Sequence, residues 1–141
     1  MQPLRWTAGH QVFQAEFDAE HRELFRLAED LRHTVEDGGD HEAVRQAVDR
    51  LAAEIEAHFA HEERQMRACG YSAYAWHKRQ HDGIRHRAKI VLKQFAKGDR
   101  EALLKLVEHI AEWLQGHTGL TDRMLGAYLR NYERQHTALA S

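Results

Sequence analysis

Apolar residues recur along most of the chain at steps of three and four, which is the spacing of one face of an α-helix. Phe17, Leu24, Ala28 and Leu31 mark the first such face, and three further segments repeat the pattern. The pattern predicts four helices after an N-terminal arm over residues 1–17, and these helices cover residues 18–36, 40–69, 73–97 and 99–134.

The breaks between these segments contain residues that stop and start helices. Glycines stand at positions 38, 39, 70 and 98, and glycine is the usual residue just beyond a helix C-terminus. Asp18, Asp40 and Asp99 stand where an N-terminal cap is needed. Because short loops force consecutive helices to reverse direction, the sequence predicts an all-α, up-down-up-down antiparallel four-helix bundle with an extended C-terminal helix or tail.

Length and composition limit the number of domains and the kinds of partner. A chain of 141 residues is long enough for one hydrophobic core, so we expect a single domain over residues 1–141. The formal net charge of −2 provides no long-range attraction for nucleic acid or for acidic lipid. The single cysteine, Cys69, cannot form an internal disulfide, and no apolar run is long enough for a transmembrane segment. We therefore expect a cytoplasmic protein.

Seven polar residues interrupt the apolar faces of the four segments. A buried imidazole or carboxylate without a partner costs several kcal/mol, roughly the stability of a small domain, so their placement indicates a shared partner. The residues are His21, His58, Glu62, His77, His81, His117 and Asp122. Five imidazoles and two carboxylates facing one interior indicate a metal site.

The spacing of these residues supports that interpretation. Positions four apart on a helix differ by only about 40° in direction, so His58 with Glu62, and His77 with His81, can bind one centre. His117 and Asp122 are five apart, about 140° on a regular helix, and both can face inward only if a π-type bulge distorts the helix.

The number and type of donors favour two metals bridged by carboxylates, because seven donors are too many for one tetrahedral zinc. The alternative for each pair taken alone is a surface pair or a satisfied pair in the core. We expect His61 to be solvated, since it lies about 60° from the face that carries Glu62. We expect Asp18 and Glu63 to be capping or surface carboxylates, and the remaining histidines to be ordinary polar residues: His10, His33, His41, His86, His109 and His136.

Four segments resemble the hemerythrin family, in particular the single-domain bacteriohemerythrins. They read Asp-Ala-Glu-His over residues 18–21, His-Phe-Ala-His-Glu-Glu over 58–63, His-Lys-Arg-Gln-His over 77–81, and Trp-Leu-Gln-Gly-His over 113–117 followed by Asp122. The resemblance covers the chain from Trp6 to Asp122 and fills every ligand position of the family.

The resemblance implies a non-haem centre of two iron ions, joined by an oxo or hydroxo bridge, that binds O2 reversibly. It implies that His77, His81 and His117 hold one iron, that His21 and His58 hold the other, and that Glu62 and Asp122 bridge them. The second iron would have an open coordination position. By family position, the O2 pocket would be lined by Leu24, Phe59, Trp113, Leu114 and Thr118.

The chain departs from the family pattern at two positions and in its length. The family often has glycine where this chain has Phe13, which concerns the path of the N-terminal arm. An aliphatic residue is usual at Thr118, where a hydroxyl could admit water or a proton. The chain also runs beyond Asp122, and we expect this tail to lengthen the last helix, cover an entrance or contact a partner.

The resemblance implies an oxygen carrier rather than an enzyme. Its role would be transport or storage of O2, with delivery to an oxygen-consuming enzyme such as a methane monooxygenase as one use, and we expect a monomer. Two alternatives are an O2 or redox sensor acting through a separate partner and a di-iron enzyme that handles peroxide or nitric oxide. A metal-free bundle is a third alternative.

Overall fold

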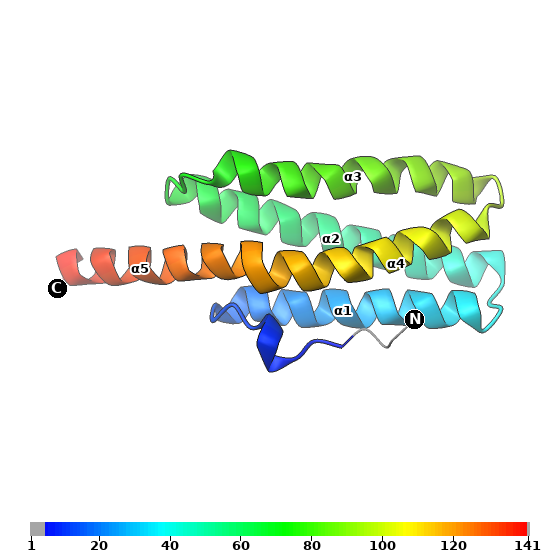
Figure 1. Cartoon of the computed structure of the whole chain (residues 1–141), viewed down its shortest axis with the longest axis horizontal. Coiled ribbons are helices and arrows are strands. Elements are labelled where there is room, and N and C mark those ends of the chain that lie inside the picture. The colour runs from blue at the N-terminus through cyan, green and yellow to red at the C-terminus, as the bar shows by residue number, and fades with distance from the viewer. Residues whose placement is uncertain (1–4, 141) are drawn as a thin grey trace.

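The protein is an antiparallel four-helix bundle whose last helix runs out of the bundle (Figure 1). The structure, a computed structural model, describes residues 5–140, with side chains up to residue 137. The helices of the bundle are α1 (Ala15–Glu36), α2 (His41–Ala68), α3 (Tyr74–Ala96) and α4 (Arg100–Gly116). A π-helical segment, η2 (His117–Asp122), joins α4 to α5 (Arg123–Ala140) without a break in the chain's direction. The predicted fold class is confirmed.

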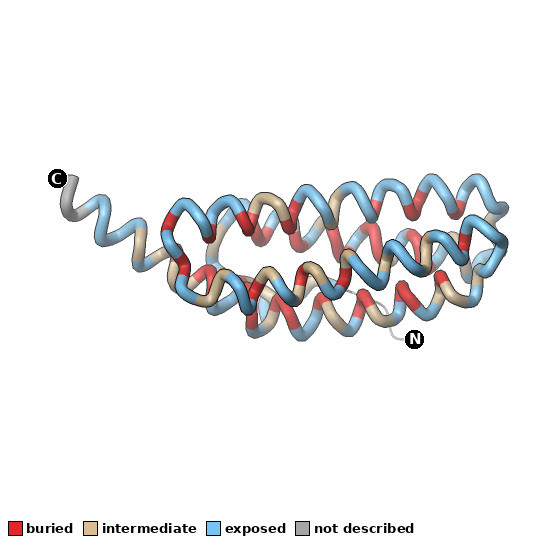
Figure 2. Tube along the Cα trace, turned by 90° about the horizontal axis from the view of Figure 1, so that it is seen from above, coloured by how far each residue is buried: buried red, intermediate tan, exposed pale blue. Residues whose placement is uncertain are grey.

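Buried residues form stripes along the inward faces of the four helices, while α5 is largely exposed where it leaves the bundle (Figure 2). One apolar cluster fills the half of the bundle near the α1–α2 and α3–α4 loops, with Leu31, Val48 and Leu106 among its members. A second, smaller cluster with Phe17, Met66 and Leu125 fills the opposite end. The seven polar residues singled out in the sequence are all buried as well. No helix in the described part of the chain is both long and apolar enough to cross a membrane.

Helix capping agrees with the sequence at two of three predicted positions. Asp40 and Asp99 accept hydrogen bonds from the backbone N–H groups of Ala43 and Ala102. Asp18 does not cap α1, and this prediction was wrong. The helix begins earlier, at Ala15, because the side chain of Gln14 accepts the N–H of Phe17.

The N-terminal arm packs across the junction of η2 and α5. Asp18 is buried and accepts the backbone N–H of Val12 at 2.8 Å, which ties the arm to the first turn of α1. Arg123 donates to the carbonyl of Gly9 at 2.8 Å. A Cβ on Gly126 would lie only 2.4 Å from the carbonyl oxygen of Val12, so glycine is required for this close approach.

The backbone at Phe13 has a φ of 62°, a left-handed conformation that favours glycine. The arm therefore keeps the backbone path of a glycine at the position where the family often has one. The side chain of Phe13 is 56% exposed, and the guanidinium of Arg130 lies 5.4 Å from its ring centre. A residue with a Cβ at this position therefore carries backbone strain.

Helix α5 continues to Ala140, beyond the predicted end near residue 134, so that boundary was wrong. The stretch over residues 135–140 contains neither glycine nor proline to stop it. The Tyr132 and His136 rings stack at 3.8 Å, one turn apart, which adds local support to the extended helix.

Candidate metal centre

All seven predicted donors converge in the bundle interior, and each of the four sequence segments contributes. His21 comes from α1, His58 and Glu62 from α2, His77 and His81 from α3, and His117 and Asp122 from η2. Each is at most 5% exposed. The i, i+4 spacing on α2 and α3 directs both members of each pair inward, as the helical repeat requires.

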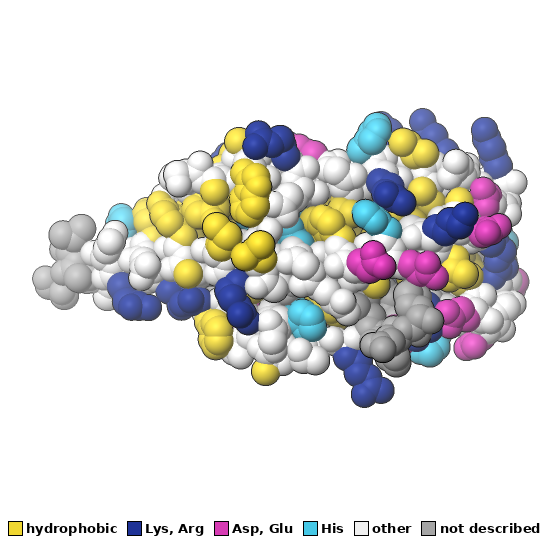
Figure 3. All heavy atoms as spheres, in the orientation of Figure 1, with side chains coloured by type: hydrophobic (Ala, Val, Ile, Leu, Met, Phe, Trp, Pro, Cys, Tyr) yellow, Lys and Arg dark blue, Asp and Glu magenta, His cyan; other side chains and the backbone are white. Residues whose placement is uncertain are grey.

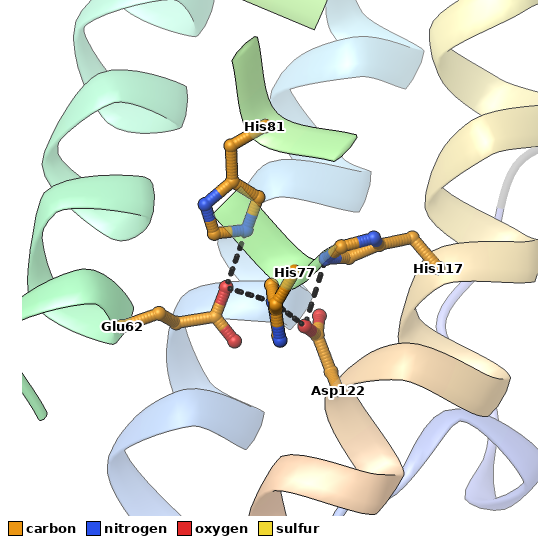
Figure 4. Close-up of side chains that lie close together, drawn as sticks. All are labelled: Glu62, His77, His81, His117 and Asp122. Carbon is orange, nitrogen blue, oxygen red and sulfur yellow. Dashed lines mark ion pairs between the residues drawn. The ribbon is translucent and has the colours of Figure 1, made fainter. Parts of the chain in front are cut away.

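The first group of donors faces the α3 side of the bundle (Figure 4). His81 Nε2 lies 3.1 Å from Glu62 Oε1, and His77 Nε2 and His117 Nε2 lie 3.0 and 2.9 Å from Asp122 Oδ1. One ligand atom from each of these five residues lies within 4.8 Å of every other. This spacing allows all five to bind one ion.

The second group shares the two carboxylates and adds the other two histidines. His21 Nε2 lies 3.0 Å from both His58 Nε2 and Asp122 Oδ2, and His58 Nε2 lies 3.3 Å from Glu62 Oε1. The ligand atoms of these four residues also lie within 4.8 Å of one another. Because Glu62 and Asp122 belong to both groups, the arrangement suits two ions bridged by carboxylates, with three histidines on one side and two on the other.

Several donor atoms at the centre of this cluster are buried without a hydrogen bond to any described residue. They include both carboxylate oxygens of Glu62, Oδ1 of Asp122, and Nε2 of His77, His81 and His117. His77 Nε2 and His117 Nε2 lie about 3 Å from Asp122 Oδ1, and His81 Nε2 lies about 3 Å from Glu62 Oε1. Unsatisfied polar atoms at this burial are costly, and bound cations would satisfy all of them at once.

The electrostatics of the cluster also favour bound cations. Burial and the neighbouring charge of Asp122 oppose ionisation of Glu62, but the imidazoles around it hold its pKa below the usual range. Burial likewise disfavours a charged His58, yet the negative charge of Glu62 and the hydrogen bond to Glu20 raise its pKa to about 10. Two ionised carboxylates in the core therefore require positive charge nearby, which protons or metal ions can provide.

A π-helix accommodates the five-residue interval between His117 and Asp122. Residues 117–122 adopt the wider turn, with both ends of the segment in ordinary helical conformation. The predicted bulge is confirmed, and it turns both side chains toward the same interior point.

Outer partners hold three of the imidazoles by their second ring nitrogen. Nδ1 of His58 lies 2.6 Å from Glu20 Oε1, Nδ1 of His81 lies 2.8 Å from Glu63 Oε2, and Nδ1 of His117 lies 2.8 Å from Gln80 Oε1. A ring that donates from Nδ1 presents the lone pair of Nε2 to the interior, which is the form that binds a metal.

Sequence reasoning missed these outer partners or misplaced them. Glu63 is buried and is also held by Arg85, whose Nη1 lies 2.7 Å from Glu63 Oε2, so its assignment as a surface carboxylate was wrong. Glu20 and Gln80 each precede a donor histidine by one residue. That position is about 100° away from the inward face and points to a neighbouring helix, which is the signal that could have found them.

His61 is not a solvated residue, so this prediction was also wrong. Its side chain is 17% exposed, and its Nδ1 lies 2.6 Å from Glu20 Oε2. Its offset of about 60° from the inward face of α2 directs the ring toward α1 rather than toward solvent. Glu20 thereby joins His61 to the donor His58.

The residues expected to line an O2 pocket are all wholly or partly buried. The Phe59 ring stacks on the donor His81 at 3.9 Å, and the Trp113 ring stacks on the donor His117 at 4.1 Å. Leu24 and Leu114 belong to the larger apolar cluster. The hydroxyl of Thr118 is buried and has no hydrogen-bond partner among the described residues.

Comparisons with known proteins agree with this donor set. A family model described as the hemerythrin HHE cation binding domain matches residues 12–129. A bacteriohemerythrin of Aquifex aeolicus is 35% identical over 107 residues, which cover 74% of this chain and 81% of that protein. A bacteriohemerythrin of Methylococcus capsulatus is 28% identical over 127 residues, covering 89% of this chain and 96% of that protein.

Solved structures show the same arrangement of helices. The crystal structure of a hemerythrin mutant superposes with a TM-score of 0.82 at 25% identity, and the match covers 90% of this chain and 97% of the other. The chain therefore belongs to the hemerythrin family, whose members hold a non-haem di-iron centre, and it carries the histidine and carboxylate donors for such a centre.

Proposed function

We propose that this protein carries or stores O2 by binding it reversibly at its di-iron centre. The observation that carries the proposal is the unequal division of histidines between two donor groups that share Glu62 and Asp122. These residues would hold two iron ions, which would supply the reversible O2 binding.

In this proposal His77, His81 and His117 bind one iron, and His21 and His58 bind the other. Glu62 and Asp122 bridge the two ions. The group with two histidines contributes one donor fewer, so the free position belongs there. Nδ1 of His21 has no described hydrogen-bond partner, whereas Nδ1 of His58 is held by Glu20.

The surrounding side chains favour carriage over oxidation chemistry. Five neutral imidazoles place less negative charge on the metals than the carboxylate-rich sites of ferritin-like di-iron proteins, which favours the ferrous state. We propose that Leu24, Phe59, Trp113 and Leu114 keep water from the bound O2, since water and protons promote irreversible oxidation. Thr118 adds a buried hydroxyl to these side chains.

We further propose that the released O2 supplies an oxygen-consuming enzyme in the cytoplasm, and that the protein acts as a monomer. The enzyme is defined only by its need for O2, and a methane monooxygenase is one example.

The test is reconstitution with ferrous iron under anaerobic conditions, followed by metal analysis and absorption spectroscopy. We expect two irons per chain and a ligand-to-iron charge-transfer band that appears with O2 and disappears on deoxygenation. His81→Ala should lose iron, whereas His33→Ala, on the outer face of α1 with a side chain 57% exposed, should keep it. One zinc per chain, or a band that does not reverse, would contradict the proposal.

A further inference from the structure

A groove with an uneven distribution of charge runs along the outer side of the bundle where α3 meets α4. Its volume is about 540 Å³, which lies within the range of about 300–1,000 Å³ typical of small-molecule sites. It is lined by Arg79, Gln80, Gly83, Ile84, His86, Arg87, Ile90, His109 and Trp113. On the face drawn in Figure 3, basic and histidine side chains gather in this region beside exposed hydrophobic ones.

Two arginines on α3 line the groove without ion pairs. Arg79 and Arg87 make no salt bridge with any described residue, whereas Arg26, Arg45 and Arg85 each contact two or more carboxylates. Eight residues apart on one helix, the two are separated by about 12 Å along its axis and by about 80° around it, and both line the groove. No lining residue is a carboxylate. The groove therefore offers two guanidinium groups to an anion.

Gly83 lies between these arginines on α3 and also lines the groove. Glycine in the middle of a helix costs about 1 kcal/mol relative to alanine, and the usual reasons for tolerating that cost are absent here. Gly83 is not among the residues with positive φ, and a Cβ built on it meets nothing within 4 Å. Neither backbone conformation nor packing requires glycine, so the space beside it is available to a ligand that approaches the helix closely.

The groove also has an apolar and aromatic part, which adjoins the metal centre. Ile90 of α3 is 47% exposed within it. The Trp113 ring also lines the groove, and it stacks on the donor His117 at 4.1 Å. Indole and guanidinium groups both stack well on planar rings, and guanidinium groups bind phosphate through paired hydrogen bonds.

We propose that this groove binds a planar aromatic molecule that carries a phosphate, the chemistry shared by nucleotides and flavin mononucleotide. The ring lies over Gly83 against Ile90 and Trp113, and the phosphate binds to Arg79 or Arg87. This site lies on the outer side of the bundle and shares Trp113 with the proposed O2 pocket. Its existence does not depend on the proposed function.

The test is calorimetric titration of the full chain, with and without iron, using flavin mononucleotide, AMP, riboflavin and inorganic phosphate. We expect flavin mononucleotide or AMP to bind one per chain and at least tenfold more tightly than riboflavin or phosphate alone, because each of the latter lacks half of the recognised chemistry. If flavin mononucleotide binds more tightly than AMP, the natural ligand is a flavin, and in the opposite case it is a nucleotide. Binding of neither, or equal binding of riboflavin, overturns the proposal.

Variants separate recognition from folding. Arg79→Gln combined with Arg87→Gln should weaken binding at least tenfold, whereas Arg50→Gln, an exposed arginine on α2 outside the groove, should not. Gly83→Leu places a bulky side chain in the groove, and its Cβ meets nothing within 4 Å, so the melting temperature should not fall, yet binding should be lost. All of these variants should keep two irons per chain. Wild-type affinity in both groove variants would overturn the assignment of the site.

Discussion

Oε1 of Glu20 lies 2.6 Å from Nδ1 of His58, the ring nitrogen that faces away from the donor cluster. The contact fixes the orientation of the ring and the position of its proton, so that Nε2 is left for the metal. Burial disfavours ionisation of Glu20, but hydrogen bonds from His58 and His61 hold its pKa below the usual range. Glu20 therefore acts as a charged positioning residue for His58.

Replacing Glu20 should weaken metal binding without removing a ligand. We expect Glu20→Ala to lower the affinity of the metal-free protein for ferrous iron about 10- to 100-fold, the usual effect of losing an outer partner of a ligating histidine. Glu20→Gln keeps an acceptor oxygen and should lose less. Anaerobic metal titration provides the measurement. Glu23→Gln is the control, because Glu23 lies on the same helix but contacts the exposed Arg26. Equal affinity in Glu20→Ala and Glu23→Gln would show that Glu20 does not position His58.

We expect Phe13 to make the protein less stable than a glycine at the same position would. Its left-handed φ of 62° is strained for any residue with a Cβ, by about 1–2 kcal/mol. Comparing Phe13→Gly with Phe13→Ala isolates this effect, because both changes remove the ring that Arg130 contacts. We expect the glycine variant to be more stable than the alanine variant by about 1 kcal/mol in urea denaturation. If Phe13→Ala is as stable as Phe13→Gly, or more stable, the backbone at position 13 is not strained.

Two glycines inside helices should respond to alanine in opposite directions. A Cβ on Gly83 meets open space, so Gly83→Ala should stabilise the protein by about 1 kcal/mol through helix propensity. A Cβ on Gly126 would meet the carbonyl oxygen of Val12 at 2.4 Å, and the arm would have to move. Gly126→Ala should therefore lower the free energy of unfolding by about 1–3 kcal/mol despite the better propensity. Thermal or urea denaturation of the two variants together gives the test, and a stabilising Gly126→Ala would mean that the arm is not packed as described.

The sequence predicted those features that depend on regular helical geometry. The spacing of His58 with Glu62 and of His77 with His81 follows from the helical repeat alone, and the interval from His117 to Asp122 required a π-type turn because no regular helix could direct both inward. The ends of α2 near Gly70 and of α3 near Gly98 were also predictable from the local sequence, because each glycine adopts a positive φ.

The features that escaped prediction depend on how helices face one another. Whether Glu20 meets solvent or His58 is decided by the rotation of α1 against α2, which a single-helix periodicity does not contain. The burial of Asp18 depends on the course of the arm over η2 and α5. The outer partners of the metal ligands were thus harder to predict than the ligands, although they lie next to them in sequence.

The stability of the metal-free protein should depend on pH in a way that metal binding abolishes. Burial alone would lower the pKa of His58 and His77, but the nearby ionised carboxylates raise these values to about 10 and about 9. Both groups have a pKa near 6.5 in the unfolded chain. Their protonation therefore stabilises the folded protein fully below pH 6.5, and that contribution is lost as the pH rises through 9 to 10.

The expected result is a free energy of unfolding that falls by at least about 1 kcal/mol between pH 7 and pH 10 for the metal-free protein, measured by urea denaturation in the presence of a chelator. Glu62 and Asp122 have lowered pKa values, so their contribution is present above about pH 4 and is lost in acid. In the iron-loaded protein the Nε2 atoms bind metal instead of protons, and the alkaline decline should disappear. A metal-free protein whose stability is flat from pH 7 to pH 10 would mean that the two histidines are already neutral at pH 7.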